Sequence, residues 1–216
     1  MALFVSFEGG EGCGKSTQAR ILYQRLLKTG IPAVFIHEPG STPLGKEVRR
    51  LLKRPSVVEI SPLAELFLVA ASRAQLVAEI IRPSLEEGIV VVCDRYSDST
   101  VAYQAYGRRI DLEVVRAVNG IATGGLVPHL TILLDLPVDI GLSRKKRARR
   151  DRFENEEVSF HWRVRGGYLQ MAAADPQRWM VIDGALSRQE IRDMVWARVN
   201  PLLQGKGEPW AGHELP

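Results

Sequence analysis

The sequence of 216 residues predicts a three-layer α/β fold in which helices flank a central parallel sheet of five strands. Two observations support this fold class. Short apolar segments rich in β-branched residues alternate along the chain with longer segments whose apolar residues have helical spacing. A glycine-rich loop at residues 9–16 also joins the first apolar segment to the first helical one.

Five short apolar segments are predicted to be the strands. The first two lie on either side of the first helical segment. The third, at residues 89–93, is wholly apolar and mostly β-branched, which is typical of a central strand in a parallel sheet. The last two repeat this pattern. The predicted strands are residues 3–8, 33–37, 89–93, 131–136 and 179–183.

Eight segments between and after these strands are predicted to be helices. The first carries Ala19, Leu22 and Leu26 at helical spacing, and the second is short and basic. The third begins at Ser61 and Pro62, because serine suits a helix cap and proline suits the first turn. The predicted helices are residues 15–28, 44–53, 61–81, 98–106, 111–122, 137–148, 156–174 and 187–203.

Composition limits the domain count and the cellular setting. An apolar content of 45% over 216 residues is enough for one large core, so one domain is expected at residues 1–204, with a flexible tail at 205–216. The net charge of +4 suits an anionic partner, either a nucleotide or a nucleic acid. Cys13 and Cys93 have no metal-binding or disulfide spacing, which favours a reducing cytoplasm. Apolar segments are too short for a membrane span, so no membrane partner is expected.

The loop at residues 9–16 carries the clearest chemical signal. Its glycines can turn backbone N–H groups toward a β-phosphate, Lys15 can bridge the β- and γ-phosphates, and Ser16 can supply a Mg²⁺ ligand. A plain glycine-rich turn is the alternative, but the strand before the loop and the helix after it are what a phosphate loop requires. Cys13 is either a reactive thiol or a small residue in a variable position. The motif G-x-x-x-x-G-K-[ST] is matched by Gly9-Gly10-Glu11-Gly12-Cys13-Gly14-Lys15-Ser16.

Three further segments fall where a second ligand would face the triphosphate. Together with the phosphate loop, their order and spacing closely resemble the thymidylate kinase family over residues 4–191. The resemblance implies a P-loop NTPase fold with a short lid near residues 144–156, and a homodimer. It also implies transfer of the γ-phosphoryl group of ATP to dTMP, giving dTDP and ADP. The segments are Glu38-Pro39-Gly40-Ser41-Thr42-Pro43-Leu44-Gly45, Phe67-Leu68-Val69-Ala70-Ala71-Ser72-Arg73 and Asp94-Arg95-Tyr96-Ser97-Asp98-Ser99-Thr100-Val101-Ala102-Tyr103-Gln104.

Arginines on three different segments suit a phosphate acceptor. Arg49, Arg73 and Arg95 lie on three different predicted segments on the carboxyl side of the sheet, and the resemblance implies that they hold the phosphate of dTMP. A solvated helix face is the alternative for Arg49. Arg95 is also expected to contact the transferring group. Asp94 ends a strand, as a Mg²⁺-organising acid does, although a helix cap or a salt bridge to Arg95 would also explain it.

A pyrimidine base needs a flat apolar surface and hydrogen-bonding groups for its edge. Phe67 is expected to stack on the base, with a place in the core as its alternative, and Gln104 offers an amide that both donates and accepts. The resemblance adds hydroxyl and aromatic residues to this pocket. The dTMP site is therefore expected to comprise Glu38, Pro39, Arg49, Phe67, Arg73, Arg95, Ser99, Thr100, Tyr103 and Gln104.

A run of basic residues at 144–152 has three interpretations: a solvated helix face, a nucleic-acid patch, or a lid over ATP. Glu11 stands where some thymidylate kinases have a basic residue. The resemblance then implies that lid arginines serve the transferring phosphoryl group, with Arg152 the first choice, and that Arg144 stacks on adenine. The ATP site is expected to comprise Gly9, Gly10, Glu11, Gly12, Cys13, Gly14, Lys15, Ser16, Thr17, Arg144, Arg149 and Arg150.

Two rival functions make different demands on these residues. A deoxynucleoside kinase would need a carboxylate base, for which Glu38 is the candidate, but it would have no acceptor phosphate for three arginines to bind. A nucleotide-gated module that binds nucleic acid would use the basic run, yet this run lacks interleaved aromatic residues. The prediction is therefore a dTMP kinase with Lys15, Asp94, Arg95 and Arg152 as catalytic residues, Ser16 and Asp94 as metal ligands, and no nucleic-acid partner.

Overall fold

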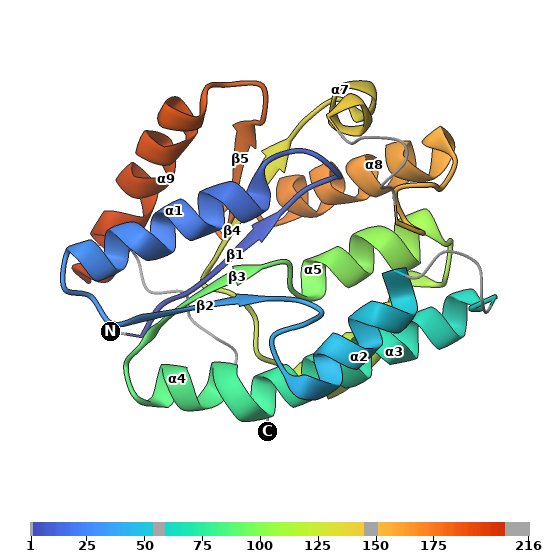
Figure 1. Cartoon of the computed structure of the whole chain (residues 1–216), viewed down its shortest axis with the longest axis horizontal. Coiled ribbons are helices and arrows are strands. Elements are labelled where there is room, and N and C mark those ends of the chain that lie inside the picture. Colours follow the sequence, from blue (N-terminus) through green and yellow to red (C-terminus); the bar gives the residue numbers. More distant parts are fainter. Residues whose placement is uncertain (1, 54–58, 145–150, 206–216) are drawn as a thin grey trace.

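The computed structural model describes residues 2–53, 59–144 and 151–205. Its five strands form one parallel sheet with the order β2-β3-β1-β4-β5 (Figure 1). The strands are short and lack a polar face, as expected for a parallel sheet that is covered on both sides. They are β1 (Phe4–Glu8), β2 (Ala33–His37), β3 (Val90–Asp94), β4 (Leu130–Asp135) and β5 (Trp179–Asp183).

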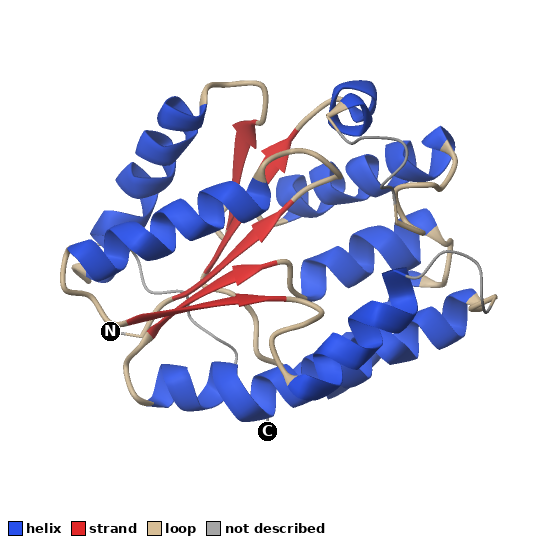
Figure 2. Cartoon of the chain, viewed as in Figure 1, coloured by secondary structure: helices blue, strands red, loops and turns tan. Residues whose placement is uncertain are grey.

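Helices cover both faces of this sheet (Figure 2). On one face, α1 (Lys15–Lys28) and α9 (Arg188–Leu203) bury apolar side chains such as Leu22 and Val195 against the strands. On the other face, α3 (Pro62–Leu76) and α8 (Val158–Ala174) are among the helices of the third layer, where Leu76 and Tyr168 are buried. The predicted three-layer α/β fold with a five-stranded parallel sheet is therefore confirmed.

The other helical elements follow the prediction closely. Ser61 caps its helix as expected, since its hydroxyl accepts a hydrogen bond from the Ala64 N–H at 3.3 Å. The elements, with η marking a π-helical segment, are α2 (Pro43–Lys53), α3 (Pro62–Leu76), η1 (Val77–Ile81), α4 (Arg82–Glu86), α5 (Ser97–Thr100), η2 (Val101–Gly107), α6 (Leu112–Thr123), α7 (Val138–Ser143) and α8 (Val158–Ala174).

Two predicted helices differ from the structure. The helix predicted for residues 61–81 continues to Glu86, because a π-helical turn in which the Arg82 N–H reaches the Val77 carbonyl accommodates Pro83, which has no N–H to donate. The helix predicted for residues 137–148 ends at Ser143, and residues 145–150 lie outside the described residues. The predicted tail also lies outside them from residue 206 on.

No helix in the described part of the chain is long and apolar enough to cross a membrane.

The carboxyl ends of the three neighbouring strands β2, β3 and β1 meet at one edge of the sheet. In the strand register, Asp94 is paired with Phe7 of β1 on one side and with His37 of β2 on the other. Glu8 is the last residue of β1, directly before the glycine loop. Polar side chains from three strands are therefore brought to the same place, which is the usual ligand position in an open parallel sheet.

Candidate active site

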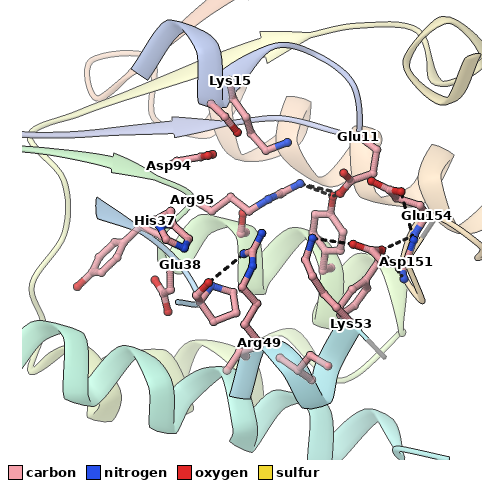
Figure 3. Close-up of a pocket in the computed structure, with 18 of the residues that line it drawn as sticks. Glu11, Lys15, His37, Glu38, Arg49, Lys53, Asp94, Arg95, Asp151 and Glu154 are labelled. Atoms are coloured by element: carbon pink, nitrogen blue, oxygen red, sulfur yellow. Dashed lines mark hydrogen bonds and ion pairs between the residues drawn. The ribbon is translucent and has the colours of Figure 1, made fainter. Parts of the chain in front are cut away.

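A cavity of about 430 Å³ lies at this edge of the sheet, between the glycine loop and the helices α2, α3 and η2. In Figure 3, Lys15 and Glu11 border it on the side of the glycine loop, and Arg49 and Lys53 reach into it from α2 on the opposite side. The residues that line it are Glu11, Gly12, Gly14, Lys15, Ser16, Thr17, His37, Glu38, Pro39, Arg49, Leu52, Lys53, Val69, Arg73, Asp94, Arg95, Tyr96, Ser99, Thr100, Tyr103, Gln104, Arg144, Asp151, Phe153 and Glu154.

The glycine loop has the backbone conformation that its sequence requires. Gly9, Gly12 and Gly14 all have positive φ angles, of 142°, 71° and 94°. At Gly12 two features exclude a side chain. One is the positive φ angle, and the other is that a Cβ there would lie 2.1 Å from the carbonyl oxygen of Gly141 in α7. Lys15 Nζ crosses back over the loop and donates to the Gly10 carbonyl at 2.9 Å. The loop is therefore a rigid cradle with an ammonium group at its mouth.

The structure separates the residues of this loop into two groups. Six of the predicted positions line the cavity, whereas Gly9, Gly10 and Cys13 are not part of its lining. Cys13 is buried in the core between α1 and the sheet, with its sulfur 4.0 Å from Lys15 Nζ. Of the two interpretations of this thiol, packing fits its burial better than a reactive role does. The loop residues on the cavity are Glu11, Gly12, Gly14, Lys15, Ser16 and Thr17.

Arg95 forms the centre of the cavity wall. Its φ of 73° is a left-handed conformation that is unfavourable for a residue with a side chain. The guanidinium group donates to the Glu11 carboxylate at 2.7 Å and to the Tyr103 hydroxyl at 3.0 Å, and Tyr103 donates to Glu11 at 2.6 Å. Glu11 therefore has a role of its own in the loop, because its carboxylate orients Arg95 and Tyr103 on the cavity wall.

Glu8 stabilises the unusual backbone conformation of Arg95, because its carboxyl group binds the N–H of the next residue, Tyr96. Its fully buried carboxyl group accepts hydrogen bonds from the Tyr96 N–H at 2.7 Å, the Ser99 hydroxyl at 2.6 Å and the Tyr168 hydroxyl at 2.9 Å. Burial, with a further contribution from the nearby charge of Asp98, raises the pKa of Glu8 to about 7. In the sequence, the signal of this group is an acid at the end of a mostly apolar strand.

Asp94 and His37 face the cavity from adjacent strand ends (Figure 3). Asp94 Oδ1 is buried, and no described residue donates a hydrogen bond to it. The expected alternative of a salt bridge to Arg95 is not seen among the described residues, since Arg95 pairs with Glu11. His37 also lines the cavity, and burial together with the charge of Arg49 lowers its pKa.

The loop after β2 presents Glu38 and Pro39 to the cavity, and α2 presents Arg49. Arg49 donates to the Pro39 carbonyl at 2.9 Å, so its charge has no carboxylate partner among the described residues. Arg73 is different, because it is 2% exposed and forms an ion pair with Glu38 at 2.8 Å. Burial raises the pKa of Glu38, and Arg73 opposes that shift. Engaged in this pair, Glu38 is poorly suited to act as a free base.

Phe67 is the predicted site residue that the structure does not bring to the cavity. Its side chain is 54% exposed and is absent from the cavity lining, whereas Val69 lines it. Helical spacing explains the difference: Val69 is four residues before Arg73 and shares its face of α3, while Phe67 is six residues before Arg73 and points elsewhere. Stacking by Phe67 on a ligand in this cavity is therefore wrong, and so is its alternative place in the core.

The remaining acceptor-side residues converge as expected. Ser99, Thr100, Tyr103 and Gln104 all line the cavity from α5 and η2. Ser99 accepts a hydrogen bond from Arg95 at 3.2 Å and donates one to the carboxyl group of Glu8. These four side chains form a polar and aromatic wall opposite α2.

The basic segment is only partly described. Arg144 lines the cavity and donates to the Gly12 carbonyl at 3.2 Å, whereas Arg149 and Arg150 lie outside the described residues. Arg152 does not line the cavity: it donates to the Leu52 carbonyl at 2.9 Å and pairs with Glu65 of α3. Asp151, Phe153 and Glu154, in the later part of the segment expected to be the lid, also line the cavity.

Comparisons with known proteins cover nearly the whole chain. The thymidylate kinase family model matches residues 7–195. The thymidylate kinase of Dehalococcoides mccartyi (strain ATCC BAA-2266 / KCTC 15142 / 195) is 51% identical over 204 residues, which cover 94% of this chain and 99% of that protein. The thymidylate kinase of Synechococcus sp. (strain JA-2-3B'a(2-13)) is 50% identical over 201 residues, which cover 93% and 96%. The crystal structure of thymidylate kinase from Ehrlichia chaffeensis is similar with a TM-score of 0.75 and 31% identity, over 92% of this chain and 98% of that one.

Proposed function

The chain belongs to the thymidylate kinase family, and we propose that the cavity is where it transfers the γ-phosphoryl group of ATP to dTMP, giving dTDP and ADP. One observation carries the proposal: a single cavity of about 430 Å³ joins Lys15 of the phosphate loop to Arg49 and Arg95 on the far side. A phosphate acceptor is already anionic at neutral pH, so the reaction needs alignment and charge neutralisation more than a general base.

The phosphate loop is proposed to bind ATP through residues Gly9, Gly10, Glu11, Gly12, Cys13, Gly14, Lys15, Ser16 and Thr17. Its backbone N–H groups would surround the β-phosphate, and the start of α1 adds positive potential there. Lys15 would exchange its contact with the Gly10 carbonyl for the β- and γ-phosphates. Arg144, which contacts the loop at the Gly12 carbonyl, is proposed to stack on adenine, and Arg149 and Arg150 remain proposed ATP contacts on the basis of sequence alone.

Mg²⁺ is proposed to lie between Ser16 and Asp94. Hard cations prefer oxygen ligands, and both residues offer oxygens to the cavity beside Lys15. The buried Asp94 Oδ1, to which no described residue donates a hydrogen bond, fits this assignment. When bound, the ion would neutralise charge on the β- and γ-phosphates. The chain's own contribution is to hold the Ser16 hydroxyl and the Asp94 carboxylate at adjacent element ends.

The acceptor phosphate is proposed to lie between Arg49 and Arg95. Arg49 has no carboxylate partner among the described residues, and Arg95 is held at the cavity centre by Glu11 and Tyr103. Both guanidinium groups can therefore meet an incoming phosphate with little rearrangement. Arg73 is proposed to be the third arginine near the acceptor phosphate, although its ion pair with Glu38 neutralises part of its charge.

The thymidine part of dTMP is proposed to occupy the wall formed by Val69, Ser99, Thr100, Tyr103 and Gln104. Val69 supplies the apolar surface in place of Phe67. Gln104 is 2% exposed and its amide offers hydrogen bonds to the base edge. Glu38 and Pro39 close the pocket at the loop after β2.

Arg152 is proposed to reach the transferring phosphoryl group once the segment near residues 144–156 closes as a lid. In the structure this arginine is tied to Leu52 and Glu65 on the acceptor side, so it would have to exchange these contacts for the phosphoryl group. Closure of a lid over nucleotide is common in kinases and excludes water from the reaction.

A homodimer is proposed through the surface formed by α3 and α6. Phe67 and Leu63 of α3 are exposed, as are Val114 and Ile121 of α6, the last with 85% exposure. α3 and α6 pack against each other, and apolar side chains exposed on two neighbouring helices are typical of a protein–protein interface. A second copy of this chain is the proposed partner.

Cytoplasmic localisation is proposed as well, because Cys13 and Cys93 are both free thiols.

A substrate panel tests this function directly. Phosphoryl transfer from ATP with Mg²⁺ would be measured by a coupled ADP assay with dTMP, dUMP, UMP, dCMP and thymidine as acceptors. We expect dTMP to give the highest kcat/KM and thymidine to give no turnover, since a neutral nucleoside has no phosphate for Arg49 and Arg95. Turnover of thymidine above that of dTMP would contradict the proposal and favour a deoxynucleoside kinase.

A further inference from the structure

Glu65 is a fully buried acid beside the acceptor cavity. It lies on α3 with no exposed surface, one helical turn before Val69 and two before Arg73, so all three share one face of the helix. Val69 and Arg73 line the cavity, and Glu65 lies behind it. An acid in this position must find hydrogen-bond donors inside the protein.

Three side chains donate to Glu65. Gln104 donates its Nε2 to Oε1 at 2.8 Å, Arg108 makes two bonds of 3.1 Å to the two carboxylate oxygens, and Arg152 pairs with Oε2. The two guanidinium groups neutralise the carboxylate, and Arg108 is in turn held by Glu156 at 2.6 Å. Arg108 remains with Glu65 when Arg152 moves to the phosphoryl group, so Glu65 stays a paired acceptor against which Gln104 rests.

This contact determines which way the amide of Gln104 points. An ionised carboxylate can only accept hydrogen bonds, so the amide nitrogen of Gln104 must face Glu65 and its carbonyl oxygen must face away. One amide proton is used by Glu65. The carbonyl oxygen, which receives no hydrogen bond from any described residue, and the second amide proton remain for the cavity that Gln104 lines.

The orientation of this amide distinguishes two kinds of pyrimidine edge. Thymine and uracil present an N3–H donor beside a C4 carbonyl acceptor, which complements the carbonyl oxygen and the remaining amide proton of Gln104. Cytosine presents an N3 acceptor beside an amino donor and would need the amide turned over. Turning it over would set the carbonyl oxygen of Gln104 against the carboxylate of Glu65, two acceptors with no proton between them.

We propose that Glu65 is a positioning residue that makes the acceptor site select pyrimidines with an N3–H, because it fixes the amide of Gln104 in one orientation. Glu65 does not touch the substrate itself. The inference rests on the proposed function, in which Gln104 contacts the base of dTMP. It assigns the choice between oxo and amino pyrimidines to a residue behind the pocket wall.

The test compares dUMP with dCMP, which differ only at this edge of the base. In Glu65→Gln the new amide can turn either end toward Gln104, so both orientations of Gln104 become possible. We expect the ratio of kcat/KM for dUMP over dCMP to fall by at least about tenfold, with an absolute gain for dCMP. Arg108→Gln is the matched control, since it breaks the same buried network but leaves the carboxylate in front of Gln104. Its ratio should stay within about twofold of the wild type.

A purely structural role for Glu65 would give a different result. In that case Glu65→Gln and Arg108→Gln would lower both activities in proportion, and an unchanged ratio in Glu65→Gln would overturn the inference. Gln104→Ala separates this from a failure of the proposed base contact. If Gln104→Ala leaves the ratio unchanged, the base contact itself is wrong and the inference falls with it. If Gln104→Ala changes the ratio and Glu65→Gln does not, only the role of Glu65 is wrong.

A second variant covers the case in which Glu65→Gln does not fold. The double variant Glu65→Gln/Arg108→Gln removes one cation together with the anion, so it leaves less uncompensated buried charge. Compared with Arg108→Gln alone, it should show the same fall of at least about tenfold in the dUMP to dCMP ratio. An equal ratio in these two variants would overturn the inference.

Discussion

Replacing the buried carboxyl group of Glu8 by an amide should change how the stability of the protein depends on pH. Glu8 is fully buried beneath Arg95, and burial raises its pKa from 4.5 to about 7. In Glu8→Gln the amide oxygen can still accept from the Tyr96 N–H, and the amide nitrogen can donate to the Ser99 or Tyr168 oxygen. The variant therefore keeps the local geometry but cannot ionise.

The sign and size of the effect follow from the two pKa values. Between pH 4.5 and about pH 7 the unfolded chain has lost the Glu8 proton while the folded chain retains it. The contribution of Glu8 to the free energy of unfolding is thus fully present below about pH 4.5 and is lost as the pH rises through about 7. At about 1.4 kcal/mol per pH unit, the loss in the wild type is roughly 3 kcal/mol, of which roughly 2.5 kcal/mol falls between about pH 5 and about pH 8.

Urea unfolding followed by circular dichroism would measure this at several pH values. The free energy of unfolding of Glu8→Gln minus that of the wild type should rise by roughly 2.5 kcal/mol over this range. Taking the difference cancels the opposite contributions of His37 and His129, whose pKa values are lowered by burial, and that of Glu38, whose pKa is raised. The exposed Glu113→Gln serves as a control that should run parallel to the wild type. A difference that is flat with pH would refute the reasoning.

Four further substitutions test the proposed site. Lys15→Ala should lower kcat by at least about 100-fold with little change in melting temperature, because it removes the ammonium group at the loop mouth, and near-normal turnover would exclude this role. Val69→Ala should raise the KM for dTMP roughly five- to tenfold through lost apolar contact, whereas Phe67→Ala should leave KM unchanged; the reverse result would restore Phe67 to the pocket. Arg152→Ala should lower kcat by about 100-fold in steady-state assays, and a change in KM alone would assign the phosphoryl contact to another lid arginine.

Most of the fold was predictable because its signals are local. Each of the five strands was found within about two residues of its predicted bounds, since short apolar segments of a covered parallel sheet are distinct from helical ones. The cap at Ser61 and the glycine loop were likewise predictable from neighbouring residues. The continuation of the third helix past Pro83 was missed, because a π-helical turn that accommodates a proline has no clear sequence pattern.

The site was predictable where a motif has fixed spacing and not where its partners come from distant segments. The phosphate loop illustrates the first case: Lys15 and Ser16, which the motif places at fixed positions, both line the cavity. Phe67 illustrates an error of position along a helix. The residue of α3 that lines the pocket is Val69, two residues later, and Phe67 is exposed. Glu65 was not recognised at all, because its donors lie in segments 39, 43 and 87 residues away along the chain.

The sequence alone determined the phosphate loop, the parallel α/β sheet and the family, since each depends on residues that are close together or in a fixed order. Only the tertiary structure decided which charges meet. It paired Glu11 with Arg95, buried Glu8 beneath them, and set Glu65 behind Gln104. The physical reason is that hydrogen bonds and ion pairs act over a few ångströms in space, and only the folded packing brings side chains from distant segments within that range.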